Sequence, residues 1–426
     1  MIKETSKRKS LFSVDMFEYF LGKISQLKLN NHCSKYCSKE GSIMERSNEI
    51  IKKIRNNESV FEVANGNKLY INSSRLSSSG NATSEENSIF YGVNAGILAK
   101  EGAFIDIQNS TITTTGKGAN AIFSHGDKSL INIDNVILKT KGDFSNGLNS
   151  GAKATVKAHD ISINTEGNNS AAIAVYSENG IIDVSNAIAT CEGENSPCVY
   201  SRGNIMINDS NLKAEKAVGA VIDGKSLMIN NTIINSKENC GVMLFQDNDK
   251  SEKTNKSIFA SNLGSIIAGK GALFFVTNTE AVVTLFNTKL IPSITSNILV
   301  NACKGKWGKE GENGGKLMLK GRHQTLKGDI LCDELSYVNL NLKDYTYFTG
   351  IINERNRGHV SINLDSTSVW TVTGNSYIDY IESENKELNN IIDNGYSIYY
   401  NAKNEKNAWL NGAEYGLAGG GKLIPA

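Results

Sequence analysis

Phe104-Ile105-Asp106-Ile107-Gln108-Asn109 and Leu130-Ile131-Asn132-Ile133-Asp134-Asn135 are two copies of a motif that recurs through the middle of the chain. Each copy ends in Asn or Asp, and the ends of successive copies lie 22 to 26 residues apart. A period of this length is typical of a stacked array of short structural units. The end positions of the six clearest copies are Asn109, Asn135, Asp160, Asn186, Asp209 and Asn231.

The pattern inside the motif indicates β-strand. In the first copy, Ile105 and Ile107 flank the polar Asp106, and most other copies repeat this alternation. Alternation with a period of two places the apolar side chains on one face of a strand, and the β-branched residues at these positions also favour strand. A helical repeat would need a longer apolar stripe at helical spacing, and the repeats contain none.

The Asn or Asp that ends each motif stands where the chain must bend. Both residues tolerate the left-handed conformation and hydrogen-bond nearby backbone groups. Stacked at strand spacing, ~4.8 Å, their side chains are expected to form a hydrogen-bonded ladder that continues to Asn262 and Asn287. The sequence therefore predicts an all-β fold, a parallel β-helix with coils of about 22 to 26 residues, and right-handed by the crossover rule.

The bulk composition agrees with a folded solenoid. Of 426 residues, 39% are hydrophobic and 21% charged, and Gly is frequent at 39 residues against 3 Pro. The net charge of +1 creates no strong field for nucleic acid. No run of 18 apolar residues is present, so no integral membrane segment is expected.

The seven cysteines have no disulfide spacing. Cys191 and Cys198 bracket a turn, and the sequence leaves open whether they pair or remain free thiols. His32, Cys33 and Cys37 are too few ligands for a structural zinc site. We expect neither a bound metal nor a cofactor.

Three regions follow from these patterns. Residues 1–60 are expected to form a helical cap over the open end of the array, with helices near 13–27 and 43–54. Residues 61–400 are expected to form the β-helix, with a polar, exposed loop at 77–87. Residues 401–426 lose the alternation and are predicted to be an irregular tail.

Catalytic chemistry is not evident. Glycosidic hydrolysis uses two carboxylates that flank one bond. Asp106 and Asp183 share an outward column but lie three coils apart, roughly 14 Å at strand spacing. The usual nucleophile, nucleotide and metal-protease motifs are missing. We therefore assign no catalytic residue.

Aromatic side chains are the candidates for ligand contact. Tyr176, Tyr200, Tyr345 and Tyr347 are predicted to stack on sugar rings. Packing of the same rings against their neighbours across strands is the alternative.

The C-terminal third carries a family resemblance. Segments 324–330 (QTLKGDI), 336–342 (SYVNLNL), 349–350 (TG) and 370–376 (WTVTGNS) resemble the C-terminal coils of autotransporter passengers, and with residues 94–240 they resemble bacterial adhesin-like β-helix proteins. The resemblance implies a surface-displayed or extracellular, non-enzymatic solenoid. Its partner would be a polysaccharide or a surface protein of a host or neighbouring cell. The alternative is a carbohydrate-binding or pectate-lyase-like, polysaccharide-cleaving β-helix.

Overall fold

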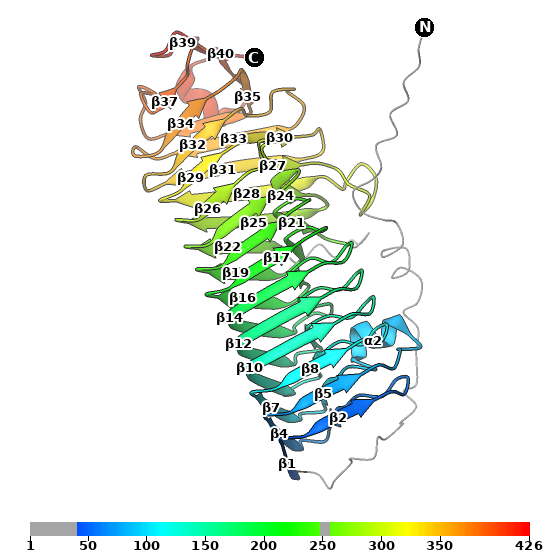
Figure 1. Ribbon diagram of the computed structural model, residues 1–426. Helices are drawn as coiled ribbons and strands as arrows, with labels where there is room; N and C mark the ends of the chain where they lie inside the picture. Colours follow the sequence, from blue (N-terminus) through cyan, green and yellow to red (C-terminus); the bar gives the residue numbers. More distant parts are fainter. Residues whose placement is uncertain (1–40, 248–255) are drawn as a thin grey trace.

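The recurring motif forms a strand in each coil, and that strand pairs in parallel with its equivalent in the next coil. Ile105 pairs with Ile131, and Ile107 with Ile133. The computed structural model describes residues 41–247 and 256–426, which form a right-handed parallel β-solenoid of about 15 turns (Figure 1). The predicted fold class is confirmed.

Most strands of the described chain belong to two long sheets. The main sheet has 21 strands and the second sheet 11, within the residues that the structure describes. The main sheet comprises β1 (Ile43–Ser47), β2 (Ile50–Lys53), β4 (Lys68–Asn72), β5 (Arg75–Ser78), β7 (Phe104–Gln108), β8 (Thr111–Thr114), β10 (Leu130–Thr140), β12 (Thr155–Thr165), β14 (Ile181–Cys191), β16 (Asn204–Asn208), β17 (Asn211–Ala214), β19 (Ser226–Asn230), β20 (Ile233–Ser236), β22 (Ser257–Asn262), β23 (Ser265–Ala268), β25 (Thr279–Phe286), β26 (Lys289–Ile291), β28 (Gly315–Arg322), β31 (Tyr337–Lys343), β33 (His359–Leu364) and β36 (Tyr380–Ser383). The second sheet comprises β3 (Phe61–Val63), β6 (Ile97–Lys100), β9 (Ile122–His125), β11 (Leu148–Gly151), β13 (Ile173–Val175), β15 (Val199–Ser201), β18 (Ala220–Asp223), β21 (Val242–Phe245), β24 (Ala272–Val276), β27 (Ile298–Ala302) and β30 (Asp329–Cys332).

Shorter elements complete the coils and close the C-terminal end. Two four-stranded sheets lie in the last coils of the described chain. One contains β29 (Thr325–Lys327), β32 (Tyr347–Gly350), β34 (Val369–Val372) and β37 (Ile391–Ile392), and the other β35 (Ser376–Ile378), β38 (Ile398–Tyr400), β40 (Lys422–Pro425) and β39 (Tyr415–Gly416). Among the described residues the helical elements are α2 (Glu85–Tyr91) and the 3-10 turn η1 (Glu405–Leu410).

The main sheet bends at one residue per coil, and we call this row of residues the corner column. Its members have φ between 43° and 58°, the left-handed region that Asn and Asp tolerate. Predicted turn residues Asn109, Asn135, Asp160, Asn186, Asp209, Asn231 and Asn287 all occupy it, together with Asn48, Ser73, Leu263 and His323.

Hydrogen bonds join several corner side chains in adjacent coils. Asn135 Nδ2 donates to Asn109 Oδ1 at 2.8 Å, and Asn231 Nδ2 donates to Asp209 Oδ1 at 2.8 Å. Asn186 donates to Asp160 in the same way. The predicted ladder is therefore present as linked pairs.

Asn262 is not a corner residue, and that prediction is wrong by one position. It ends strand β22, where it pairs with Asn230 and Phe286 and donates to Asn230 Oδ1 at 2.7 Å. Leu263 takes the bend, with φ of 54°. The reason is register: Phe259 aligns with Leu227 one coil earlier, which moves the corner one residue beyond the asparagine.

We expect Asn135→Ala to destabilise the protein more than Asn135→Gly. Alanine loses the ladder bond and is held at φ of 51°, which costs about 1–2 kcal/mol for a residue with Cβ. Glycine also loses the bond but adopts this conformation freely. The midpoints of urea unfolding measure the difference, and equal losses in both variants would contradict the proposed role of the left-handed bend.

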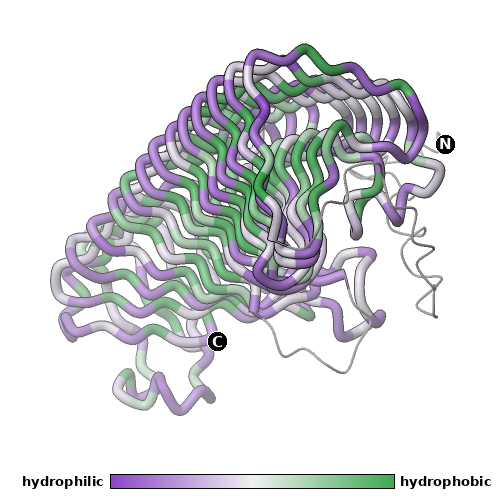
Figure 2. The backbone as a smooth tube through the Cα atoms, turned by 90° about the horizontal axis from the view of Figure 1, so that it is seen from below, coloured by the Kyte–Doolittle hydropathy of each residue, from purple (hydrophilic) through white to green (hydrophobic). Residues whose placement is uncertain are grey.

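The aliphatic pairs of the motif fill the interior. Ile105, Ile131, Val156 and Ile182 are buried in one continuous core cluster that extends to Leu423. Seen along the axis, hydrophobic positions form stripes inside the coils (Figure 2). Residues of the second sheet differ, because strands such as β18 and β21 are buried on both faces.

Two predictions about the N-terminal part of the solenoid need correction, and a third is not tested. Residues 43–54 form strands β1 and β2, not a helix, because β1 pairs with β4 and β2 with β5, which continue the array. Segment 77–87 is not a wholly exposed loop: Ser78 and Ala82 are buried, and α2 begins at Glu85. The helix predicted near 13–27 lies outside the described residues.

The C-terminal residues are ordered, which corrects the prediction of an irregular tail. Strand β40 pairs in parallel with β38, and Leu410 and Leu423 are fully buried. Apolar side chains without an alternating pattern thus close this end of the core. Cys191 and Cys198 are both free and buried. No helix of the described chain is long and apolar enough to cross a membrane.

Candidate functional site: a corner groove and an aromatic ledge

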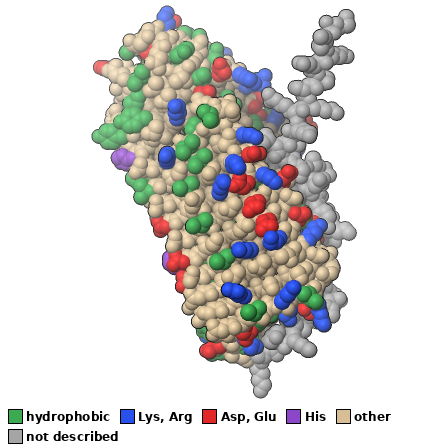
Figure 3. All heavy atoms as spheres, in the orientation of Figure 1, with side chains coloured by type: hydrophobic (Ala, Val, Ile, Leu, Met, Phe, Trp, Pro, Cys, Tyr) green, Lys and Arg blue, Asp and Glu red, His purple; other side chains and the backbone are tan. Residues whose placement is uncertain are grey.

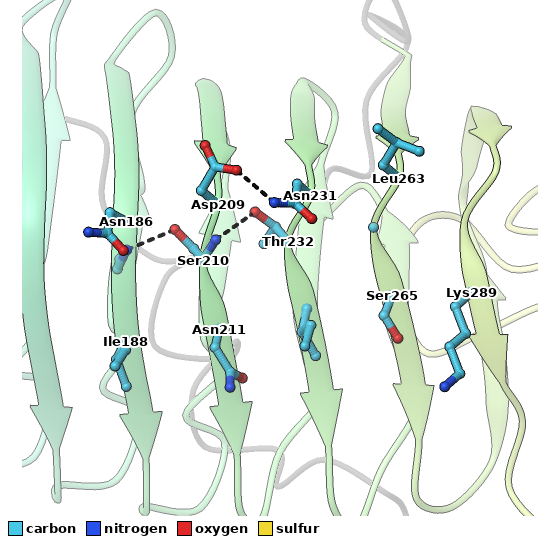
Figure 4. A pocket seen from close by; sticks show the side chains of 13 residues that line it. Asn186, Ile188, Asp209, Ser210, Asn211, Asn231, Thr232, Leu263, Ser265 and Lys289 are labelled. Atoms are coloured by element: carbon cyan, nitrogen blue, oxygen red, sulfur yellow. Dashed lines mark hydrogen bonds between the residues drawn. The ribbon is translucent and has the colours of Figure 1, made fainter.

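A groove of about 430 Å³ follows the corner column, and we call it the corner groove. It begins beside Asn186 and ends beside Lys289, where the main sheet bends (Figure 4). Its lining residues are Asn186, Ala187, Ile188, Asp209, Ser210, Asn211, Asn231, Thr232, Ile233, Leu263, Gly264, Ser265 and Lys289.

The floor of the groove is fixed by hydrogen bonds between coils. The backbone N–H of Ala187 donates to Ser210 Oγ at 3.0 Å, and the N–H of Ser210 donates to Thr232 Oγ1 at 3.2 Å. Figure 4 shows Asp209 and Asn231 linked above this floor. A groove whose polar groups already bond to one another is preorganised, so a ligand would cost little ordering entropy.

The rim combines apolar and uncharged polar groups. Ile188 is 65% exposed and Leu263 50% exposed, so both side chains add apolar surface to the rim. Asp209 and Lys289 are the charged side chains among the described lining residues. This mixture suits a neutral ligand with both apolar faces and hydroxyl groups.

A row of exposed rings continues from the groove toward the C-terminus, and we call it the aromatic ledge. Its members are Phe286, His323, Tyr345 and Tyr347. Phe286 and His323 meet edge to face with ring centroids 5.5 Å apart, and His323 stacks on Tyr345 at 6.1 Å. In the space-filling view, exposed hydrophobic side chains gather beside a histidine at this edge (Figure 3).

The predicted stacking residues separate into two groups. Tyr345 and Tyr347 are 58% and 49% exposed and belong to the ledge. Tyr200 is only 5% exposed, so its ring is not available to a ligand. Tyr176 stacks on Tyr200 with ring centroids 4.7 Å apart. These two rings therefore pack against each other across strands, which was the alternative to stacking on a sugar. The sequence did not indicate Phe286, His323 or Leu263, because their proximity depends on pairing between coils.

Tyr200 belongs to a buried polar cluster on the second sheet. Its hydroxyl donates to Asp223 Oδ2 at 3.1 Å, and Arg202 Nε lies 3.5 Å from the same oxygen. The backbone N–H of Asp247 donates to Asp223 Oδ1 at 3.3 Å. Burial raises the pKa of Asp223, and the positive charge of Arg202 partly offsets this. None of these residues lines the corner groove.

We expect this cluster to make stability fall as pH rises from about 4 to about 6. Burial, and then the charge of Asp223, raises the pKa of Asp247 to about 6, against about 3.9 when unfolded. Because the pKa of Asp247 is higher in the folded protein than in the unfolded chain, protonation of this carboxyl stabilises the fold fully below the unfolded pKa. This stabilisation is lost as the pH rises through the folded pKa. Allowing for partial exposure, the loss is about 1–2 kcal/mol. Asp247→Asn should flatten this part of the stability–pH curve, and an unchanged slope would contradict the assignment.

Two other groups of titratable side chains have the chemistry of a catalytic or a metal site. Asp106 and Asp183 share one outward column with Asn132 and Lys157 between them, as predicted, so they are too far apart to flank one glycosidic bond. Potential ligand atoms of Asp134, His159 and Asp160 lie within 4.8 Å of one another, but all three side chains are exposed. His159 Nδ1 contacts Ser185 Oγ at 2.9 Å, and His159 Nε2 lies 3.4 Å from Asp160 Oδ2. Contacts among surface side chains therefore account for this proximity.

Charges on the flank of the solenoid neutralise one another within and between coils. Lys213 and Lys237 both pair with Glu215, the second at 2.9 Å, and Lys141 pairs with Glu166 at 3.2 Å. Positive and negative side chains are interspersed on the face shown in Figure 3. Such a surface does not concentrate one sign of charge.

The fold and the groove define the class of this protein as a parallel β-solenoid with an axial surface groove. Comparisons with protein-family models, with curated proteins and with solved structures gave no match to the chain.

Proposed function

We propose that the protein is a non-enzymatic, adhesin-like solenoid displayed at the cell surface, and that it binds an extended neutral carbohydrate along the corner groove and the aromatic ledge. The observation that carries the proposal is the continuity of these two features. From Asn186 through Leu263 to Tyr345, the corner groove and the aromatic ledge together cross seven coils, or roughly 29 Å at strand spacing. A linear polymer matches a site of this length and periodicity better than a compact ligand does.

The chemistry of the site favours sugar. Exposed rings such as Tyr345 and Tyr347 offer flat apolar faces for the C–H surface of a pyranose. Asn211 and Ser265 place side-chain amide and hydroxyl groups in the groove, and these can bond sugar hydroxyls.

Binding without cleavage is favoured over hydrolysis of a polysaccharide, and the pectate-lyase-like alternative is left to the product assay below. Asp209 is the one carboxylate among the described lining residues, whereas glycoside hydrolysis generally needs a pair.

A glycan array, followed by titration of the strongest ligand, tests the proposal. Tyr345→Ala should weaken binding about tenfold, because one stacked ring is worth roughly 1–1.5 kcal/mol. Tyr91→Ala is the matched control: Tyr91 is 43% exposed and also contacts a histidine, His125, at 5.5 Å, away from the groove. It should leave binding unchanged.

Two results would contradict the proposal. Equal affinity of Tyr345→Ala and the unmodified protein for every glycan that binds would remove the ledge from the site. Release of reducing sugar or unsaturated uronate from a bound polysaccharide would establish the enzymatic alternative. Surface display is tested separately, by fractionating cells that produce the full chain, and a purely cytosolic location would contradict it.

A further inference from the structure

Isoleucines recur at every second coil in the strand segment that follows the bend of the main sheet. The first outward residue after the bend is Ile137 on β10, Ser162 on β12, Ile188 on β14, Asn211 on β17, Ile233 on β20 and Ser265 on β23, and each pairs with the next in this series. We call this series the alternating row. Its isoleucines, Ile137, Ile188 and Ile233, are 44%, 65% and 38% exposed, so they present apolar surface to solvent.

The alternating row contributes to the lining of the corner groove. Ile188, Asn211, Ile233 and Ser265 all line it, and Figure 4 shows Ile188, Asn211 and Ser265 in one row across the strands. Apolar and polar side chains therefore alternate along the groove, and the pattern repeats after two coils, or about 9.6 Å at strand spacing. A polymer that contacts every member of the row needs a matching repeat.

This repeat does not match a bound peptide. An amphipathic α-helix lying along the groove makes one apolar contact per turn, every ~5.4 Å, and would place apolar side chains against the polar members of the row. A β-strand turns a side chain to the same face every ~6.6 Å, so it loses register with the isoleucines within two coils. Neither is complementary to apolar groups two coils apart with polar groups between them.

A straight glycan has the required repeat. In a chain of pyranose rings joined through equatorial bonds at positions 1 and 4, each ring faces the opposite way to the ring before it. Each ring also lengthens the chain by nearly one strand spacing. The same ring face and the same hydroxyl groups therefore recur at every second ring. Chains with α-1,4 or β-1,3 links wind into helices instead and do not have this straight repeat.

We propose that the carbohydrate bound in the corner groove is a straight, neutral, β-1,4-linked glycan, an inference that rests on the function proposed above. The C–H face of every second ring lies against Ile188 and Ile233, which removes apolar surface from water. The rings between them offer hydroxyl groups to Asn211 and Ser265, whose side chains both donate and accept hydrogen bonds. The alternating row thus selects the linkage between sugars, whereas the aromatic ledge stacks on pyranose faces of either kind of chain.

The linkage preference of the unmodified, full-length protein tests the inference. Hexasaccharides of glucose, mannose and N-acetylglucosamine with β-1,4 links are titrated beside the α-1,4- and β-1,3-linked hexasaccharides of glucose. At least one β-1,4-linked ligand should bind at least about tenfold more tightly than both helical glucans, a difference of about 1.4 kcal/mol. If the strongest ligand on the glycan array has no β-1,4 links, or if all linkages bind equally, the inference is wrong and the proposed function stands. If no glycan binds, both are wrong.

Exchanging two members of the row tests the repeat itself. Ile188→Asn/Asn211→Ile keeps the composition of the groove but puts isoleucines in adjacent coils. Binding of the β-1,4-linked ligand should weaken about tenfold or more, because an apolar contact and a hydrogen bond are both lost.

Ile181→Asn/Asn204→Ile is the matched control for this exchange. These two residues also pair directly between the same two coils, but neither lines the groove, so binding should not change. All four exchanged side chains are exposed, and both variants should keep the β-type circular dichroism spectrum of the unmodified protein. Equal affinity of the two folded variants for the ligand would overturn the inference.

Discussion

Gly142→Ala is expected to destabilise the solenoid by about 3 kcal/mol or more, the upper range for overpacking a well-packed site. A Cβ at position 142 would lie 2.0 Å from the carbonyl oxygen of Gly116, in the preceding coil. Gly167 and Gly193 repeat this contact, each against the glycine one coil earlier, at 2.0 and 1.9 Å. The atom in the way is backbone and cannot rotate aside, so the coils would have to separate locally. The midpoint of urea unfolding measures the loss.

Gly416→Ala is the matched control. Gly416 has no atom within 4 Å of a Cβ built on it, and its φ is not in the left-handed region. The same substitution there should change stability by less than about 0.5 kcal/mol, as at an ordinary surface position. Equal midpoints for the two variants would contradict the contact between the stacked glycines.

Arg202→Met is expected to cost about 3 kcal/mol. The side chain of Asp223 is only 3% exposed, and removing one partner of a buried ion pair leaves an uncompensated charge, at a typical cost of 3–5 kcal/mol. The lower figure applies because a quarter of the Arg202 side chain is exposed. Adding Asp223→Asn in the same chain should recover most of the loss, since it removes the charge and keeps the shape. The double-mutant cycle is measured by urea unfolding at pH 7.

Arg322→Met is the matched control for this second prediction. Arg322 Nε lies 3.5 Å from Asp344 Oδ2, the same atom types and distance as in the Arg202–Asp223 pair, but the two side chains are 63% and 48% exposed. Exposed pairs contribute about 0–1 kcal/mol. If both Arg→Met variants lost the same stability, burial would not be the cause.

Several errors at the residue level have one physical origin. Helical spacing of isoleucines at 43–54 predicted a helix, yet pairing with β4 and β5 makes this segment the first coil of the described array. Asn262 has the side chain expected at a bend, but the register of β22 places Leu263 there. In both cases pairing with a coil 25 or 32 residues away overrides the local preference.

The candidate site likewise combines features that the sequence indicates with features that depend on the pairing between coils. The sequence named Tyr176, Tyr200, Tyr345 and Tyr347 alike as candidates, and it could not separate the exposed Tyr345 and Tyr347 from the buried Tyr200. The ledge itself requires Phe286, His323 and Tyr345 to be adjacent, and they are 37 and 22 residues apart along the chain. A glycine seven residues after Asn109, Asn135, Asp160 and Asn186 was visible as a repeat, but its reason is a close contact between coils.

The sequence by itself determined the period of the coil, which side chains of the first main-sheet strand point inward, and most bends of that sheet. Alternation along a strand and the left-handed preference of Asn and Asp are local properties, so they are visible in a single coil. Only the tertiary structure decided the bend at Leu263, the assembly of groove and ledge, and the burial of Tyr200 and Asp223. These features depend on which side chains of different coils lie next to one another, and separation along the sequence does not reveal those neighbours.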